Sequence, residues 1–301
     1  MSENTQEQSR AITPIQRFNK AITNQATQDY ISQVIGNPRI MRSYVTNIIA
    51  LVSNSTQLQE CEPMSVIYAG LTATGLNLSL AQSLGESYVV PYKDKKRGVT
   101  IATFQIGAKG WYKLAVNTKQ YKNITWGDIR EGEIVGYDCD SGLHKVIRLE
   151  NREKLPIIGH RAVFELNWGL KKEVYMTIAE LKAHGQRYSQ SYRSGYGQWV
   201  DDFPSACDKT VMKLLISRFG VKSSEIEEAI TFDNAMIDKD KPIYVDNEKE
   251  PTEREIEIAR QITEKFGNKI KVDDIPATNF EEVKTDSSQT ENPELFKEPK
   301  K

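Results

Sequence analysis

Positively charged residues gather in the middle of the chain, at spacings that suit an extended anionic ligand. Two β-rich runs, residues 87–92 and 98–104, flank a turn that holds four cations and a single acid, Asp94. Alternating runs around a short polar turn are typical of a β-hairpin, so we expect the four side chains to project together from its tip. They are Lys93, Lys95, Lys96 and Arg97.

Two pairs of lysines stand four residues apart on predicted helices. Lys109 and Lys113 lie in a short helix after the hairpin, and Lys209 and Lys213 lie in a later helix that begins near Pro204. Like charges at this spacing repel each other by roughly a few tenths of a kcal/mol. Solvation explains either pair alone, but its recurrence on two helices favours an anionic ligand that both pairs share.

Residues 182–200 combine cations with aromatic rings and contain no acid. Cations follow the phosphates of a single nucleic-acid strand, and aromatic rings stack on its unpaired bases. Gly195 and Gly197 favour a loop that leaves the rings accessible, although burial of the tyrosines is the alternative. The cations and rings of this segment are Lys182, Arg187, Arg193, Tyr188, Tyr192, Tyr196 and Trp199.

The overall net charge of −1 hides a segregation of charge along the chain. Residues 1–92 contain 5 Lys or Arg and 6 Asp or Glu, residues 93–222 contain 23 and 14, and residues 223–301 contain 12 and 21. The middle region therefore carries +9 and the last region −9. A basic middle followed by an acidic end is typical of a nucleic-acid-binding protein with an interaction tail.

Metal and redox chemistry find little support in the residue spacing. The three cysteines are widely separated and form no CxxC pattern, and the three histidines lack metal-ligand spacing. We therefore expect no disulfide framework, no metal site and no cofactor. These residues are Cys61, Cys139, Cys207, His144, His160 and His184.

Two other motifs invite a catalytic interpretation. Gly70 and Gly75 have the spacing of the two P-loop glycines, but Leu76 stands where the phosphate-binding lysine is required, so we reject a nucleotide site. Four acids near predicted turns suggest a metal cluster, but solvated hairpin ends are the favoured interpretation. They are Glu131, Glu133, Asp138 and Asp140.

The order of predicted elements indicates an α+β fold. Helices begin at Asn37 and at Glu62, and five β-branched or alternating runs follow the central helix in the manner of an antiparallel meander. Thr177 and Glu180 form a capping box that opens another helix. The runs are residues 121–129, 133–137, 143–149, 157–166 and 173–176. The expected architecture is N-terminal helices, a central antiparallel β-meander with packed helices, and a flexible acidic C-terminal tail.

The N-terminal residues contain no cationic-then-apolar signal segment. No apolar run approaches the roughly 20 residues that a membrane span requires. We expect a cytoplasmic protein without membrane contact.

Three blocks of sequence follow one another in a distinctive order. They are MSVIYAGLTATGLNLSLAQSLGESYVVPY at residues 64–92, FQIGAKGWYKLA at residues 104–115, and Gly197-Gln198-Trp199 followed by Asp208-Lys209-Thr210. Together they resemble the RecT family of phage and prophage single-strand annealing proteins, over about residues 35–222. An ordered succession of blocks is more specific than any one short motif.

The resemblance implies an ATP-independent recombinase, not an enzyme, that coats single-stranded DNA, anneals complementary strands and assembles into rings or filaments. Lys109 and Gly110 match the family's basic-glycine pair, and Lys209 and Thr210 match its late Lys-Thr. Lys213 stands where the family leads us to expect Arg, and Lys lacks the bidentate fork of Arg. Gly220 also departs, because Pro is common there. The candidate DNA-binding residues are Lys93, Lys95, Lys96, Arg97, Lys109, Tyr112, Lys113, Arg187, Tyr188, Tyr192, Arg193, Lys209 and Lys213.

We divide the chain into an N-terminal extension (1–34), a DNA-binding and annealing core (35–222) and an acidic, partly disordered tail (223–301). A capping box at Thr252 predicts a short helix near 252–267, with an apolar stripe of Ile258, Ile262 and Phe266. Such a stripe docks on a partner or folds back on the body, and we favour a partner. Implied partners are single-stranded DNA, the annealed duplex intermediate, further copies of the chain and, through the tail, a cognate exonuclease and the host single-strand-binding protein.

Two other functions compete with annealing. One is a metal-dependent nuclease or other DNA-processing enzyme that uses acids within residues 128–140. The other is a structural protein that coats DNA without annealing it.

Overall fold

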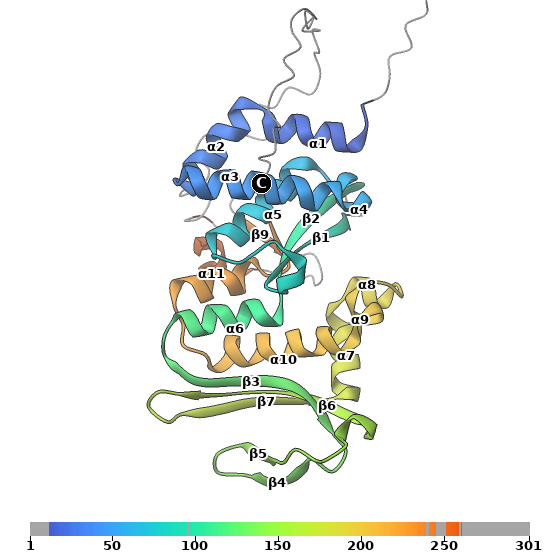
Figure 1. The fold of residues 1–301 in the computed structure, drawn as a ribbon, viewed down its shortest axis with the longest axis vertical. Coiled ribbons are helices and arrows are strands. Elements are labelled where there is room, and N and C mark those ends of the chain that lie inside the picture. Colours follow the sequence, from blue (N-terminus) through green and yellow to red (C-terminus); the bar gives the residue numbers. More distant parts are fainter. Residues whose placement is uncertain (1–11, 95–96, 239–240, 245–250, 259, 261–301) are drawn as a thin grey trace, which may run out of the picture. The chain divides into compact units, whose positions relative to one another are not determined.

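The structure is a computed structural model that describes residues 12–94, 97–238, 241–244, 251–258 and 260 (Figure 1). Its N-terminal part is helical, and capping residues set the helix boundaries. As predicted, Asn37 begins α3, where its side chain accepts the N–H of Arg39 at 2.9 Å. Within the described part of the chain, no helix combines the length and the apolar character needed to cross a bilayer. The helices are α1 Pro14–Thr23, α2 Gln25–Ile35, α3 Pro38–Ser53, α4 Thr56–Gln59 and α5 Pro63–Gly75.

Helix α5 is the centre of this helical part and contacts α1, α2 and α3. Gly70 allows the close approach of α3, because a Cβ at this position would lie 2.8 Å from the Ile48 side chain. Tyr44 of α3 also donates a hydrogen bond to the Ile67 carbonyl at 2.7 Å. Gly70 therefore serves helix packing, which accounts for the glycine without a phosphate site.

The predicted hairpin is present as β1 Ser87–Asp94 and β2 Val99–Ile106, which pair antiparallel and contact α5. Gly98 has φ +68° in its turn, a conformation that glycine adopts without strain. A 3-10 turn, η1 Gln82–Leu84, precedes it. Helix α6 Ala108–Asn117 follows as the predicted short helix after the hairpin.

A three-stranded antiparallel sheet in the order β3-β6-β7 follows α6, in the region where the sequence predicted the antiparallel meander of an α+β fold. Strands β4 and β5 form a separate hairpin inserted between β3 and β6. Val135, Gly136 and Tyr137 of β4 are exposed, so neither face of this strand is covered by the larger sheet. The elements are β3 Tyr121–Arg130, β4 Ile134–Asp138, β5 Leu143–Val146, η2 Arg152–Lys154, β6 Ile157–Leu166 and β7 Lys171–Thr177.

Helix α10 Phe203–Phe219 contacts α6 and all three strands of the sheet (Figure 1). Alternate residues of β6 are buried, and Ala162, Phe164 and Leu166 form the apolar face. Before α10 come α7 Ile178–Tyr188, α8 Gln190–Arg193 and α9 Gln198–Asp201. The capping box that opens α7 is formed as predicted.

The packed body extends beyond both ends of the predicted core. Phe18 and Ile22 of α1 are buried, although residues 1–34 were expected to form an extension. After residue 222, α11 Ser224–Phe232 buries Ile226 and Phe232, and strands β8 Ala235–Asp238 and β9 Lys241–Tyr244 follow. The acidic composition concealed α11, because its charged residues stand between apolar positions at helical spacing.

Candidate nucleic-acid interface

The tip of the β1–β2 hairpin presents cations to solvent. Lys93 and Arg97 are exposed, and Asp94 accepts the backbone N–H of Arg97 at 3.2 Å. Lys95 and Lys96 lie outside the described residues. The described part of the tip thus retains the cationic character predicted from the sequence.

Helix α6 carries an exposed stripe with two of the candidate lysines. Trp111, Leu114 and Ala115 are buried on the opposite side. Gly110 is required at its place, because a Cβ there would lie 2.1 Å from the Glu86 carbonyl oxygen. The matched Lys109-Gly110 pair thus combines an exposed cation with a close backbone contact. The stripe, which we call the α6 stripe, consists of the exposed residues Lys109, Tyr112 and Val116 together with half-buried Lys113.

Lys113 has an internal partner that the sequence analysis did not predict. Its ammonium lies 2.8 Å from a carboxylate oxygen of Glu86, which also accepts the N–H of Ser79 at 2.8 Å. Partial burial raises the pKa of Glu86, but the hydrogen bonds from Lys113 and Ser79 outweigh it and leave that pKa lowered. Lys109 is exposed, so the pair is not equally available for the shared anion that the sequence predicted.

The segment 182–200 is mostly helical, and its aromatic residues divide into two groups. The rings of Tyr192 and Trp199 lie 5.7 Å apart over Gly185, where a Cβ would lie 2.9 Å from Trp199. Tyr188 is 36% exposed, and the guanidinium of Arg187 lies 5.1 Å from its ring centroid. The first group serves packing, whereas Tyr188 and also Tyr196, which is 58% exposed, remain accessible.

Arg193 serves the end of α7, whereas the sequence analysis placed it at the DNA interface. Its guanidinium donates to the carbonyl oxygens of Gln186 at 2.9 Å and Arg187 at 3.0 Å. Carbonyls at a helix C-terminus lack intrahelical partners, so this contact stabilises α7. Arg187 and Lys182 stay exposed cations of the segment.

The second lysine pair faces the interior, where Asp233 receives both ammonium groups. Asp233 has no exposed side-chain surface, and its oxygens lie 2.6 Å from Lys213 Nζ and 3.9 Å from Lys209 Nζ. It also accepts the N–H of Ile106 at 2.8 Å, and Lys209 donates to Gln105 at 2.9 Å. The sequence analysis assigned both lysines to a shared anionic ligand, but in the structure both ammonium groups lie near Asp233 instead.

Burial raises the pKa of Asp233, but the charges of Lys209 and Lys213 outweigh it and leave the carboxylate with a lowered pKa. The side chain therefore remains ionised and joins α10 to the end of β2. We call this arrangement the Asp233 lock.

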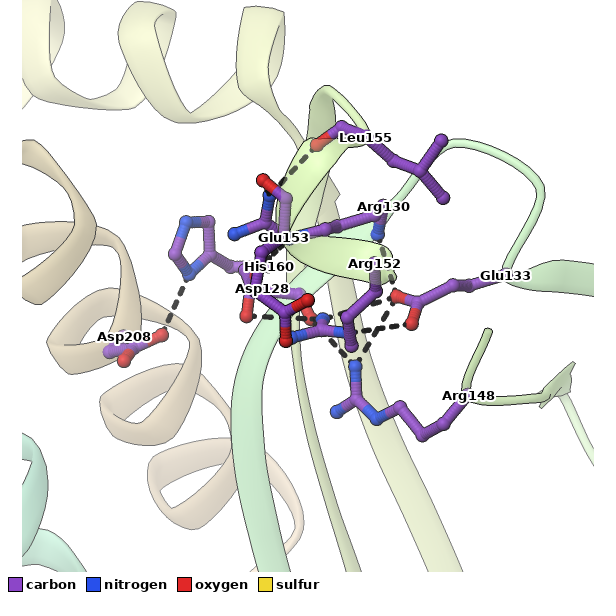
Figure 2. Close-up of polar contacts among 9 residues, drawn as sticks. All are labelled: Asp128, Arg130, Glu133, Arg148, Arg152, Glu153, Leu155, His160 and Asp208. Atoms are coloured by element: carbon purple, nitrogen blue, oxygen red, sulfur yellow. Dashed lines mark hydrogen bonds and ion pairs between the residues drawn. The ribbon is translucent and has the colours of Figure 1, made fainter. Parts of the chain in front are cut away.

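Acids near the β3–β4 turn are bound by arginines (Figure 2). Glu133 has no exposed side-chain surface and lies 2.7 Å from Arg152 and 3.3 Å from Arg148. The Arg152 hydrogen bond is the main cause that lowers the Glu133 pKa to about 2. Asp128 contacts Arg130 at 2.7 Å and Arg152 at 3.2 Å. Glu133 was predicted to be a solvated turn residue, but its side chain is buried. Both of its carboxylate oxygens have arginine partners.

The remaining acids of this region fit the solvated interpretation better. Glu131, Asp138 and Asp140 are exposed, and Asp138 accepts the Ser141 hydroxyl at 2.7 Å. Elsewhere His160 is buried and its Nδ1 lies 2.7 Å from Asp208 of α10 (Figure 2). Across the described residues, no three His, Cys, Asp or Glu side chains come together as a metal ion would require.

The start of the predicted 252–267 helix lies against the body. Thr252 and Glu255 form the expected capping box, with the Thr252 N–H 2.7 Å from the Glu255 carboxylate. Arg254 contacts Glu227 of α11 at 2.7 Å, and Ile258 packs against the core. Ile258 therefore folds back on the body, which corrects the preference for a partner at this position. Ile262 and Phe266 lie outside the described residues.

Comparisons with known proteins match the part of the chain that contains the three sequence blocks. The RecT family model matches residues 42–253. The chain belongs to the RecT family. It is 34% identical to YqaK of Bacillus subtilis strain 168, an uncharacterized protein, over 218 residues that make up 72% of this chain and 67% of YqaK. It is 26% identical to RecT of Escherichia coli K12 over 178 residues, which make up 58% of this chain and 65% of that protein.

Membership in the RecT family supports roles in DNA binding, single-strand annealing and recombination. The RecT match continues past residue 222 and includes Asp233. Sequence reasoning missed three residues that contact the candidate residues. Asp233 and Glu86 pair with lysines, and the ring of Trp126 lies 5.4 Å from that of Tyr112. The short apolar spacing of α11 offered a signal for a buried helix before Asp233. Nothing local marked Glu86 or Trp126.

Proposed function

We propose that this RecT family member is an ATP-independent protein of homologous recombination that binds single-stranded DNA, anneals complementary strands, and forms oligomeric rings or filaments. The observation that supports it most is the α6 stripe, where exposed Lys109 stands beside a partly exposed tyrosine. A cation and a ring on one surface suit a strand whose phosphates and bases are both accessible.

The mechanism requires binding and no covalent step. Cations of the hairpin tip and of α6 offset the repulsion between the phosphates of two strands. Contacts to phosphate and sugar carry no sequence information, so base edges stay free to pair and sequence preference is weak. A neighbouring subunit would extend the same surface, which makes binding cooperative along the strand.

One assay separates this function from its competitors. Complementary labelled strands are mixed with the protein, with and without magnesium and ATP, and duplex formation and cleavage are scored. We expect duplex without ATP and without cleavage. Magnesium-dependent cleavage would favour the nuclease, whose acids Asp128 and Glu133 already have arginine partners. Binding without duplex formation would leave a structural coat protein.

Assembly and partners are the finer parts of the proposal. Sedimentation with and without a long single strand tests whether the chain forms rings or filaments, and electron microscopy of the same samples gives their form. A cognate exonuclease and the host single-strand-binding protein are the partners expected for residues 261–301. Pull-down with the chain ended after residue 260 tests whether these residues are needed.

A further inference from the structure

Tyr112 and Trp126 form an aromatic pair where α6 meets the sheet. Their ring centroids lie 5.4 Å apart with an interplanar angle of 47°. Tyr112 comes from the α6 stripe and is 38% exposed. Trp126 comes from β3, an edge strand of the three-stranded sheet. The pair is therefore reachable from solvent on the side of α6 that carries Lys109.

The position of Trp126 is set by packing. Its side chain is partly buried and contacts the hydrophobic core. A ring held in this way loses little conformational freedom when a ligand stacks on it, so ordering costs little binding free energy. An isolated exposed ring, such as that of Trp168 with 62% exposure, lacks this support.

A cation stands at the spacing of a neighbouring phosphate. Lys109 precedes Tyr112 by three residues, so both lie on one face of α6, about 4.5 Å apart along its axis. This rise is comparable to the roughly 3.4 Å between successive nucleotides of one strand. The N-terminus of α6 also has no side-chain cap, which adds a partial positive charge near Lys109.

We propose that Tyr112 and Trp126 form a base-stacking subsite for single-stranded DNA, with Lys109 binding the adjacent phosphate. This inference rests on the proposed function and specifies which parts of the strand α6 contacts, a base and its neighbouring phosphate. A stacked base keeps its hydrogen-bonding edge free. The subsite therefore holds a strand in a state that can still pair with its complement.

The test compares oligo(dT) with an otherwise identical strand that contains a run of abasic sites. For the wild-type protein we expect about tenfold tighter binding to the strand with bases. Tyr112→Ala and Trp126→Ala should each reduce this preference several-fold while leaving the dependence on salt unchanged, because stacking neutralises no phosphate. Trp168→Ala is the matched control and should keep the preference.

Fluorescence provides a readout that does not depend on a truncated core side chain. Oligo(dT) should quench the tryptophan emission of the wild type, and Trp126→Phe should remove most of that quenching while retaining binding. Trp168→Phe should leave the quenching in place. Equal binding of both strands by the wild type, or full quenching in Trp126→Phe, would overturn the stacking subsite alone. Failure of the wild type to bind either strand would overturn the proposed function as well.

Discussion

Helices α6 and α10 each carry two lysines four residues apart, yet the structure gives the two pairs different roles. On α6, Lys109 is exposed and Lys113 meets a carboxylate that is itself partly exposed. On α10, both ammonium groups are directed to Asp233, which has no exposed side-chain surface. The same spacing therefore leaves an accessible cation on one helix and serves internal cohesion on the other.

The partner of each pair decides between these roles. A buried carboxylate is strongly destabilising unless cations and hydrogen-bond donors surround it, so Lys209 and Lys213 cannot leave Asp233 at low cost. Solvent weakens an ion pair at the surface, and the Lys113–Glu86 pair is partly exposed, so Lys113 can exchange its carboxylate for a phosphate more easily than the α10 lysines can. Burial of the partner, not lysine spacing, separates a structural cation from one that is available to DNA.

The largest effect is expected when Asp233, the partner of the α10 lysines, is removed together with α11, the helix that precedes it. A chain that ends after Lys222 lacks α11 and Asp233, and we expect it not to fold cooperatively, as judged by circular dichroism during urea denaturation. A chain that ends after Gly267 keeps every described element and should unfold like the full-length protein. Cooperative unfolding of the shorter chain at the normal urea concentration would refute the Asp233 lock.

Replacing the lysines of α10 should have the second-largest effect on stability. Lys209→Met with Lys213→Met leaves a buried charge without cations and should lower the free energy of unfolding by about 3 kcal/mol, measured by urea denaturation. Adding Asp233→Asn should restore part of the loss, because it removes the charge and keeps an acceptor for the Ile106 N–H. Lys109→Ala with Lys113→Ala is the matched control, with a loss below about 1 kcal/mol.

Glu133 is a second buried carboxylate held by cations, here Arg148 and Arg152, and its role can be tested by changing the pH. Because the Glu133 pKa is lowered from 4.5 to about 2, its contribution to stability is complete above pH 4.5 and is lost as the pH falls towards 2. Glu133→Gln should therefore show a smaller loss of stability than wild type between pH 5 and pH 3 in urea denaturation. Asp140→Asn, an exposed acid, is the control. Identical pH dependence in Glu133→Gln and wild type would mean that the arginines do not hold this carboxylate ionised.

The smallest change in stability should accompany a clear change in DNA binding. Lys109→Ala should reduce the slope of log affinity against log salt concentration by about 0.7, the value for one phosphate on a single strand. Lys113→Ala should reduce it less, because Glu86 already pairs with that ammonium. Fluorescence anisotropy with oligo(dT) at several salt concentrations measures both. An unchanged slope in Lys109→Ala would remove α6 from the interface.

Much of the fold could be predicted because its signals are local. Asn37 caps α3, Thr177 opens α7, and local spacing predicted the short helix that is α6. The α+β class with antiparallel strands and packed helices was confirmed. The pairing of β3 with β6 across the inserted β4–β5 hairpin was not predicted, because strand pairing depends on contacts between distant residues. The predicted end of the core at residue 222 differs from the structure for a related reason. The average charge of a segment does not reveal which of its faces is buried.

The sequence by itself determined the family, the helix caps and the cationic character of the middle region, because each depends on residue type and short spacing. Only the tertiary structure decided which cations are available. Asp233 lies 20 residues after Lys213 in the chain yet 2.6 Å from it in space, and Glu86 is 27 residues from Lys113 yet 2.8 Å away. Coulomb energy depends on distance and burial, and neither is encoded at the lysine itself.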